Sequence, residues 1–202
     1  MPDTEGLLAR FRAAHTQVLG VSIDSVHCHA NWAVSLGGVS FPLLADFHPK
    51  GAVAASLGVY LAAAGITDRA TVIIDAGGVV RHLSAVTPAG SRDIAELAAL
   101  CEGVDAAWSG KLPALPVGAG VQDATLYIKS KCGFSLRALN ARSNLHLDAS
   151  VSVVNISEDA QAATTLQTLT GKLQVPCLVV GGEAMHESDD IVRRLAGLAA
   201  PV

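Results

Sequence analysis

Short apolar runs of strand length alternate in the first half of this chain with segments that have the period of a helix. The predicted elements are strands at 18–23, 70–75 and 79–83 and helices at 26–36, 51–57 and 91–102. Ala76-Gly77-Gly78 between the last two strands is typical of a hairpin turn, and Ser91 is the expected N-cap of the last helix. Strands and helices in alternation predict an α/β fold.

The same alternation resumes in the second half. A β-type run at 124–128 leads into a short cationic loop and a helical run at 136–142, and a last helix opens at 187–191. We therefore expect two domains, at residues 1–104 and 123–202.

The segment between these domains has a different composition. Residues 105–122 contain two prolines and three glycines and have no sustained period, which predicts a linker. Trp108, Leu112 and Leu115 are apolar enough to pack on a domain surface, so we expect a partly packed connector.

Composition and charge restrict the function classes. The 202 residues are 50% hydrophobic and 16% charged, and the net charge of −4 offers no basic surface for nucleic acid. The N-terminus has no basic segment followed by an apolar one, and no apolar run reaches the roughly 18 residues needed to span a bilayer. We expect a cytoplasmic protein that binds neither nucleic acid nor membrane.

Four cysteines lie far apart in the sequence: Cys28, Cys101, Cys132 and Cys177. No Cys-x-x-Cys pair and no zinc-type spacing occurs, so neither a disulfide scaffold nor a metal site is predicted. Cys101 falls on the apolar face of its predicted helix and Cys177 enters an apolar run, so both are expected in the core.

Cys132 has different surroundings, because it lies between a predicted strand and a predicted helix. At a helix N-terminus, unpaired N–H groups and the positive end of the helix dipole favour a thiolate, and Lys129 and Lys131 add positive charge. We interpret Cys132 as a reactive nucleophile; the alternative is a small packed residue. Ser135 either donates a hydrogen bond to the thiolate or caps the helix.

Several motifs follow in a recognisable order. Cys132-Gly-Phe-Ser135, with Lys129 before it, Val175-Pro176 after a second helix and 187–191 opening the last helix, resembles a monothiol glutaredoxin. The resemblance implies that the Cys132 thiolate takes glutathione from a glutathionylated protein or small-molecule disulfide. A second glutathione, the co-substrate, then releases it as oxidised glutathione.

The same resemblance implies how glutathione is held. Lys129 meets the glycine carboxylate, Val175 before a cis-proline pairs with the cysteinyl part, and Ser188 and Asp189 hold the γ-glutamyl end. The implied glutathione-binding residues are Lys129, Gly133, Phe134, Val175, Pro176, Ser188 and Asp189. Ser188 and Asp189 also fit an ordinary helix start, and Lys129 a solvated surface residue.

Two other functions remain open for this domain. Monothiol glutaredoxins with the Cys-Gly-Phe-Ser tetrad hold a [2Fe–2S] cluster between two protomers with two glutathiones, which makes cluster transport the first alternative. A non-catalytic or transferase-like glutathione-binding scaffold is the second.

The first domain carries a second resemblance. The segments are 17–25, His29-Ala-Asn-Trp32, 41–46, 51–54 and 68–75, and in this order they resemble a peroxiredoxin of the AhpC/TSA type. The resemblance implies two thioredoxin-like domains in a hybrid peroxidase, with the second domain reducing the first, and it allows a homodimer. Arg69 matches the arginine that holds the peroxidatic thiolate, and Cys28 is either packed or a resolving cysteine.

The sequence departs from the peroxiredoxin pattern at the reactive loop. No Pro-x-x-x-Thr-x-x-Cys is present. We therefore expect a first domain without its N-terminal strands and peroxidatic loop, with unpaired strand edges beside residues 18–23 and no peroxide reduction of its own.

Overall fold

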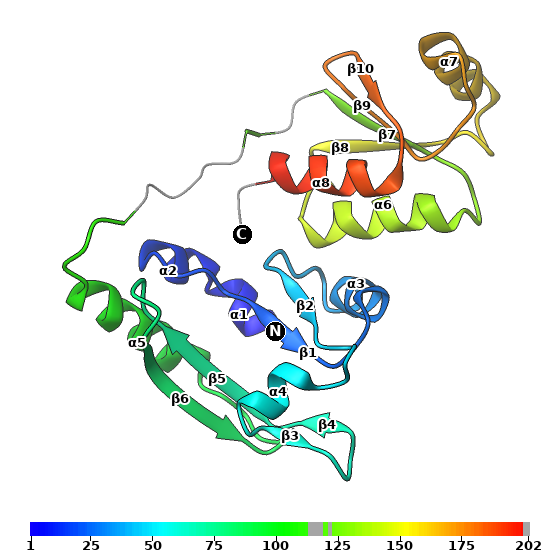
Figure 1. Cartoon of the computed structure of the whole chain (residues 1–202). Helices are drawn as coiled ribbons and strands as arrows, with labels where there is room; N and C mark the ends of the chain where they lie inside the picture. Colours follow the sequence, from blue (N-terminus) through cyan, green and yellow to red (C-terminus); the bar gives the residue numbers. More distant parts are fainter. Residues whose placement is uncertain (113–118, 121–122, 200–202) are drawn as a thin grey trace. The chain divides into compact units, whose positions relative to one another are not determined.

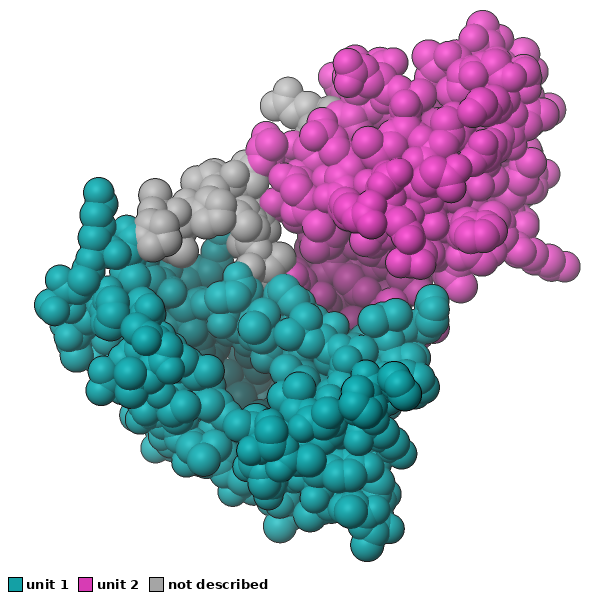
Figure 2. All heavy atoms as spheres, viewed as in Figure 1, with its two compact units in different colours: residues 1–29, 41–115, 202 teal, residues 30–40, 116–201 magenta. Residues whose placement is uncertain are grey.

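The computed structural model describes residues 1–112, 119–120 and 123–199, and Figure 1 labels its helices and strands. Two compact units divide the chain: residues 1–29 and 41–115 form the first, and residues 30–40 and 116–201 form the second (Figure 2). Both halves of the chain mix helices and strands, which confirms the predicted α/β class.

The elements that precede residue 112 include every one that the apolar pattern predicts in this half. In chain order they are α1 (Pro2–Gly6), α2 (Leu8–Ala13), β1 (Gly20–Ser22), α3 (Val26–Ser35), β2 (Leu43–Ala45), α4 (Ala52–Ser56), β3 (Tyr60–Leu61), β4 (Ile66–Thr67), β5 (Arg69–Ile74), β6 (Val80–Val86) and α5 (Ile94–Ala107). The additional elements are helices of at most six residues and strands of at most three, which are too short to give a clear period.

Among the described residues of the first unit, the strands form two-stranded sheets. β1 pairs with β2 in parallel, and β5 pairs with β6 as the predicted antiparallel hairpin. Asp75 closes the hairpin turn by accepting the N–H groups of Gly77 and Val79 at 2.9 and 3.0 Å. Within the described residues, β1 pairs with a strand on one side only, and so does β5. The unpaired side of β1 agrees with the unpaired strand edges expected beside residues 18–23.

Helix α5 differs from its prediction at both ends. Its N-cap is Asp93, whose carboxylate accepts the Glu96 N–H at 3.0 Å, so the expectation that Ser91 caps the helix was wrong. An aspartate two residues later competes for the same helix start, and aspartate is as good a cap as serine. The helix continues to Ala107 and so enters the predicted linker.

Beyond α5, the connector is described only in part. The Trp108 side chain is half-buried and lies against Gly77 of the hairpin turn, which fits the expected packed connector. Leu115 lies outside the described residues, as do the other residues of 113–118 and residues 121–122 of the predicted linker.

The second unit is built on one four-stranded sheet. Its elements are β7 (Ala124–Ile128), α6 (Gly133–Asn144), β8 (Val151–Asn155), α7 (Ala160–Thr170), β9 (Cys177–Val180), β10 (Glu183–Met185) and α8 (Ser188–Leu198). The strand order is β10-β9-β7-β8, with β7 parallel to β8 and antiparallel to β9. This is the thioredoxin-like arrangement (Figure 1).

Alternate residues of these strands point to opposite faces of the sheet, and each face packs in its own hydrophobic core. On one face, Leu126 and Leu178 pack with α6 and α8 through Ala138, Ile191 and Leu195. The opposite face packs with α7 in a second cluster, made of Ile156, Ala162, Leu166 and Cys177. Cys177 is therefore a core residue, as predicted, and burial raises the pKa of its thiol.

Two leucines of α7 test this packing. Leu166 is fully buried, whereas Leu169 is 46% exposed on the same helix. Leu166→Ala should lower the free energy of unfolding of the second unit by about 2–5 kcal/mol, because it leaves a cavity under the sheet. Leu169→Ala, the matched control, should change it by less than about 0.5 kcal/mol. Guanidinium unfolding followed by circular dichroism measures both, and equal effects would contradict the described core.

Candidate active site

Cys132 is the N-cap residue of α6. Its backbone is extended, with φ −99° and ψ 115°, and its carbonyl accepts the N–H of Leu136 at 2.9 Å. No side chain caps the start of the helix, so the first N–H groups of α6 are directed toward the region of the sulfur. The thiol is free and partly exposed, and the predicted position at a helix N-terminus is confirmed.

Ser135 is the buried polar residue of this site, with an exposed fraction of 1%. Its hydroxyl oxygen accepts the Lys129 N–H at 3.2 Å, and the hydroxyl also hydrogen-bonds to the Cys132 sulfur. A hydroxyl has one hydrogen, and accepting from Lys129 leaves that hydrogen for the thiolate. Ser135 is the third residue of α6, so the alternative in which it caps the helix was wrong.

These contacts lower the pKa of Cys132 below the ordinary thiol value. The Ser135 hydroxyl is the largest cause, the backbone N–H groups of Ser135 and Phe134 and the charge on Lys129 act in the same direction, and partial burial opposes them. The helix N-terminus and the lysines were the cause expected from the sequence, whereas the Ser135 hydroxyl has the largest effect in the structure. Lys131 is an exposed residue with φ 58°.

The loop before Cys132 is held by polar residues that sequence reasoning missed. Ser130 donates its N–H to Ser157 at 3.2 Å and its hydroxyl to Glu158 at 3.0 Å, and Asn155 donates to both Ser130 and Glu158. Because β7 and β8 are parallel, the loops after their carboxyl ends lie at the same edge of the sheet. The polar residues that begin at Asn155 were the sequence feature from which these contacts could have been predicted.

The segment before the proline contributes exposed backbone. The Val175–Pro176 peptide bond is cis, as the glutaredoxin resemblance implied, and Pro176 is buried. Within the described residues, no backbone hydrogen bond involves Val175. Its N–H and carbonyl are therefore available to an extended ligand.

Two side-chain contacts fix the two residues just before Val175. The Lys129 ammonium donates to the Leu173 carbonyl at 3.1 Å, and the Gln174 amide donates to Glu187 at 2.7 Å. The first contact joins the segment to the loop of Cys132, and the second joins it to the start of α8. The ammonium keeps further N–H donors for a carboxylate.

The start of α8 is open. Glu187 is the N-cap, with φ 68° and no side-chain capping bond, and Ser188 is the buried first residue of the helix. Ser188 is therefore not the N-cap, although Ser188 and Asp189 do lie in the first turn of the helix. Asp189 is exposed and forms an ion pair with Arg137 of α6 at 2.8 Å, a partner that no pattern in the sequence indicated.

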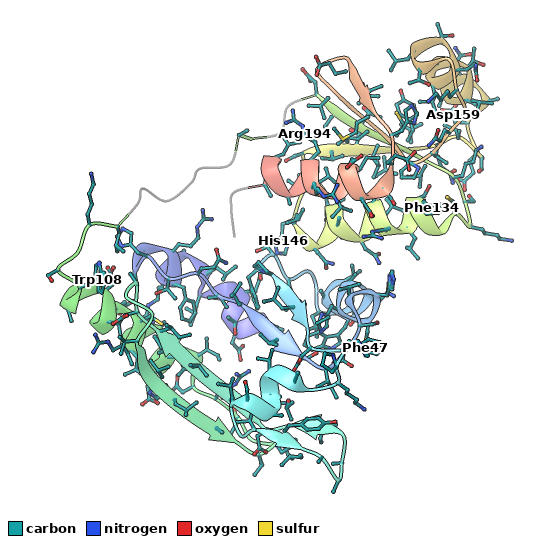
Figure 3. All side chains as sticks on the ribbon, viewed as in Figure 1. Phe47, Trp108, Phe134, His146, Asp159 and Arg194 are labelled. Atoms are coloured by element: carbon teal, nitrogen blue, oxygen red, sulfur yellow. The ribbon has the colours of Figure 1, made fainter. Side chains whose placement is uncertain are left out.

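Around the sulfur, two residues leave room for a ligand. Gly133 is exposed, and no atom lies within 4 Å of the position that a Cβ would take there. Phe134 is 68% exposed and lies at the start of α6 (Figure 3). A flexible ligand and a protein surface can both approach this end of the helix.

The first unit places its two predicted site residues in separate surroundings. Arg69 is exposed, donates to the Gly90 carbonyl at 3.2 Å, and lies close enough to Arg92 to lower its pKa, although burial has the larger effect. Cys28 is exposed, which overturns its interpretation as a packed residue, and its sulfur lies 3.9 Å from an Asp24 carboxylate oxygen.

Across the part of the chain that the structure describes, no group of three or more His, Cys, Asp or Glu side chains is arranged to hold a metal ion. Within the same residues, each helix is too short or too polar to cross a membrane.

Comparison with known proteins identifies both halves of the chain. Residues 1–83 match the AhpC/TSA family, and residues 124–185 match the glutaredoxin family. This chain joins a peroxiredoxin domain to a glutaredoxin domain. The glutaredoxin match begins with β7 and ends with β10, so it contains Cys132, Ser135 and Val175-Pro176.

Individual proteins are similar to part of this chain. Alkyl hydroperoxide reductase E of Mycobacterium tuberculosis is 36% identical over 86 residues, which cover 43% of this chain and 56% of that protein. A putative peroxiredoxin of Entamoeba histolytica is 39% identical over 83 residues, or 38% of this chain and 35% of the relative. The chain thus spans about half the length, or less, of these relatives.

Among solved structures, Mycobacterium tuberculosis AhpC aligns with a TM-score of 0.46 and 29% identity. That alignment covers 52% of this chain and 64% of AhpC.

Replacement of Ser135 tests the electrostatics of the site. Only the thiolate is alkylated, so the rate with iodoacetamide should rise as the pH passes through the pKa of Cys132. Because Ser135→Ala removes the largest cause of the lowered pKa, the midpoint of this profile should move to higher pH. Both proteins should carry Cys28→Ser, since Cys101 and Cys177 are buried.

Ser143→Ala is the control, because Ser143 lies on the same helix but contacts Asp148 instead. A midpoint that Ser135→Ala leaves in place, in a protein that remains folded by circular dichroism, would show that the hydroxyl does not stabilise the thiolate.

Proposed function

We propose that this protein catalyses glutathione-dependent thiol–disulfide exchange through Cys132. The observation that carries the proposal is a partly exposed thiol with a lowered pKa at the N-terminus of α6. At neutral pH a larger fraction of such a thiol is ionised, and the thiolate is the attacking form. The glutaredoxin match over these residues supports the same chemistry.

The reaction proceeds by two exchanges at one sulfur. The Cys132 thiolate attacks the glutathione sulfur of a mixed disulfide, the S–S bond breaks, and the other thiol leaves as a thiolate that takes up a proton. The thiolate of a second glutathione then attacks the glutathione sulfur on Cys132, which releases oxidised glutathione and regenerates the Cys132 thiolate. Ser135 cannot form a disulfide with Cys132, so exchange with glutathione resolves the intermediate.

Four segments support a site for the tripeptide. Lys129 offers an ammonium for the glycine carboxylate, and the unpaired backbone of Val175 can form hydrogen bonds with the cysteinyl residue. The uncapped start of α8, with Ser188 and Asp189, suits the γ-glutamyl end. Gly133 leaves open space beside the sulfur, and exposed Phe134 provides an apolar contact for the partner disulfide.

In the first domain, Arg69 and Cys28 are proposed for a different step. Arg69 would hold an ionised peroxidatic sulfur, and Cys28 would resolve its sulfenic acid, where such a cysteine is supplied. Residues 1–202 contain no Pro-x-x-x-Thr-x-x-Cys sequence, so we expect no peroxide turnover from them alone. Where a peroxidatic cysteine is supplied, the glutaredoxin domain would reduce the oxidised peroxiredoxin domain and consume glutathione.

Substitution of the two accessible cysteines tests the exchange. Cys132→Ser should reduce the rate of glutathione-dependent reduction of a glutathionylated peptide to that of the uncatalysed reaction, because the nucleophile is lost. Cys28→Ser, the matched control, should retain the activity. Full activity in Cys132→Ser would exclude the proposed mechanism.

The Cys-Gly-Phe-Ser tetrad supports cluster binding as the second candidate. One Cys132 per chain provides a single thiolate, so a [2Fe–2S] cluster would take its other ligands from glutathione and a second protomer. Protein purified with glutathione that is brown, dimeric and bleached by a chelator would support this role. Colourless protein that binds glutathione without accelerating exchange would instead support a non-catalytic scaffold.

A further inference from the structure

The ion pair between Arg137 and Asp189 lies where the starts of two helices meet. α6 and α8 pack side by side on one face of the sheet through Ala138, Ile191 and Leu195 (Figure 1). Ala138 is fully buried, and as a small residue it allows the two helices to approach closely. Arg137 precedes it in α6 and reaches Asp189 in the first turn of α8, with 2.8 Å between Nη2 and Oδ1.

The other acidic residues near the start of α8 have partners that do not belong to α6. Asp190 pairs with Arg193 at 2.6 Å on α8 itself, and Glu187 accepts the Gln174 amide at 2.7 Å. The pair of Arg137 and Asp189 therefore links the helix that carries Cys132 to the helix whose start is uncapped. Both side chains keep about half of their surface exposed, 47% and 54%.

We propose that Arg137 and Asp189 together recognise the free amino-acid end of the γ-glutamyl group. In this pairing, Asp189 accepts from the α-ammonium and Arg137 donates to the α-carboxylate. The inference rests on the proposed exchange at Cys132 and adds Arg137 as a residue that determines which thiol compounds react there.

The chemistry of the γ-glutamyl link explains why a pair of opposite charges is needed. Because glutathione is joined through the side-chain carboxyl of glutamate, its α-ammonium and α-carboxylate remain free on one carbon. A guanidinium has five N–H donors and a carboxylate two oxygens, so one contact between them leaves several groups for such a zwitterion. The N–H groups at the start of α8 add a second attraction for the carboxylate.

The distance between Cys132 and Arg137 along α6 is within the reach of a glutathione molecule. Arg137 lies five residues after Cys132, which corresponds to about 7 Å along a helix axis. An extended peptide spans about 3.4 Å per residue, so roughly two residue lengths cover this distance. A glutathione whose sulfur meets Cys132 and whose cysteinyl backbone meets Val175 can therefore reach the ion pair with its γ-glutamyl end.

The ion pair should favour γ-glutamyl thiols over two kinds of competitor. An ordinary α-linked peptide has its α-carboxyl in an amide bond and offers no carboxylate beside its ammonium. A simple thiol such as 2-mercaptoethanol has neither charge. Both should react at Cys132 without help from Arg137 or Asp189.

Glutathione analogues that lack one charge test the assignment on the full chain. The substrates are mixed disulfides between one reporter peptide and glutathione, deaminated glutathione, glutathione without the γ-glutamyl α-carboxylate, or 2-mercaptoethanol. Release of the reporter thiol gives kcat/KM for attack by Cys132. Arg137→Gln should lower kcat/KM for glutathione about fivefold, in the range of one partly exposed charged contact, and should not affect the analogue without the carboxylate.

Asp189→Asn should show the complementary pattern. Its kcat/KM should fall for glutathione and remain unchanged for deaminated glutathione, because that analogue lacks the ammonium. Arg193→Gln, which breaks the neighbouring pair with Asp190, is the matched control and should leave every substrate unchanged. Neither site variant should alter the rate with 2-mercaptoethanol.

The outcomes separate this inference from the proposed function. An Arg137→Gln protein that loses activity equally with all four disulfides would show a structural role for the ion pair, and one that loses none would show that Arg137 does not contact substrate. Either result would overturn the inference while wild-type exchange continued. If the wild-type protein attacks none of the disulfides, the exchange proposal itself fails.

Discussion

The hydrogen bonds of the Ser135 hydroxyl are the interaction on which the site depends. The buried oxygen accepts from the Lys129 backbone, and the hydroxyl donates to the sulfur of Cys132. One side chain thus joins the end of β7 to the start of α6 and stabilises the charge that the chemistry requires. Because Ser135 is almost fully buried, water competes little for these bonds, and they remain strong.

The sheet supplies the second constraint, since it decides which loops meet around the sulfur. Parallel pairing of β7 and β8 places the Ser130 loop beside Asn155 and Glu158, and antiparallel pairing of β7 and β9 brings the Val175–Pro176 segment to the same edge. Contacts from Leu173 and Gln174 then fix that segment to Lys129 and Glu187. The groups proposed to bind glutathione are therefore positioned by backbone pairing.

The two domains differ in which groups for thiol chemistry they contain. In the glutaredoxin domain, the nucleophile, its hydrogen-bond donors and an open ligand surface are together in one unit. In the peroxiredoxin domain, Arg69 is exposed on β5, which belongs to a two-stranded sheet, and Cys28 is exposed on helix α3. The proposed exchange is therefore assigned to Cys132 of the glutaredoxin domain.

The sequence by itself determined the α/β class, the helices and strands with a clear period, and the position of Cys132 at a helix start, because these depend on local patterns. It placed the N-cap of α5 wrongly at Ser91, because serine and aspartate are similarly good N-cap residues and only the helix geometry selects Asp93. Tertiary structure made Ser135, rather than the lysines, the main cause of the lowered pKa of Cys132. It also produced the hydrogen bonds from Asn155 to Ser130 and Glu158 and the ion pair of Arg137 with Asp189. Each of these joins residues from different elements, and their distances arise only when the sheet and its helices pack.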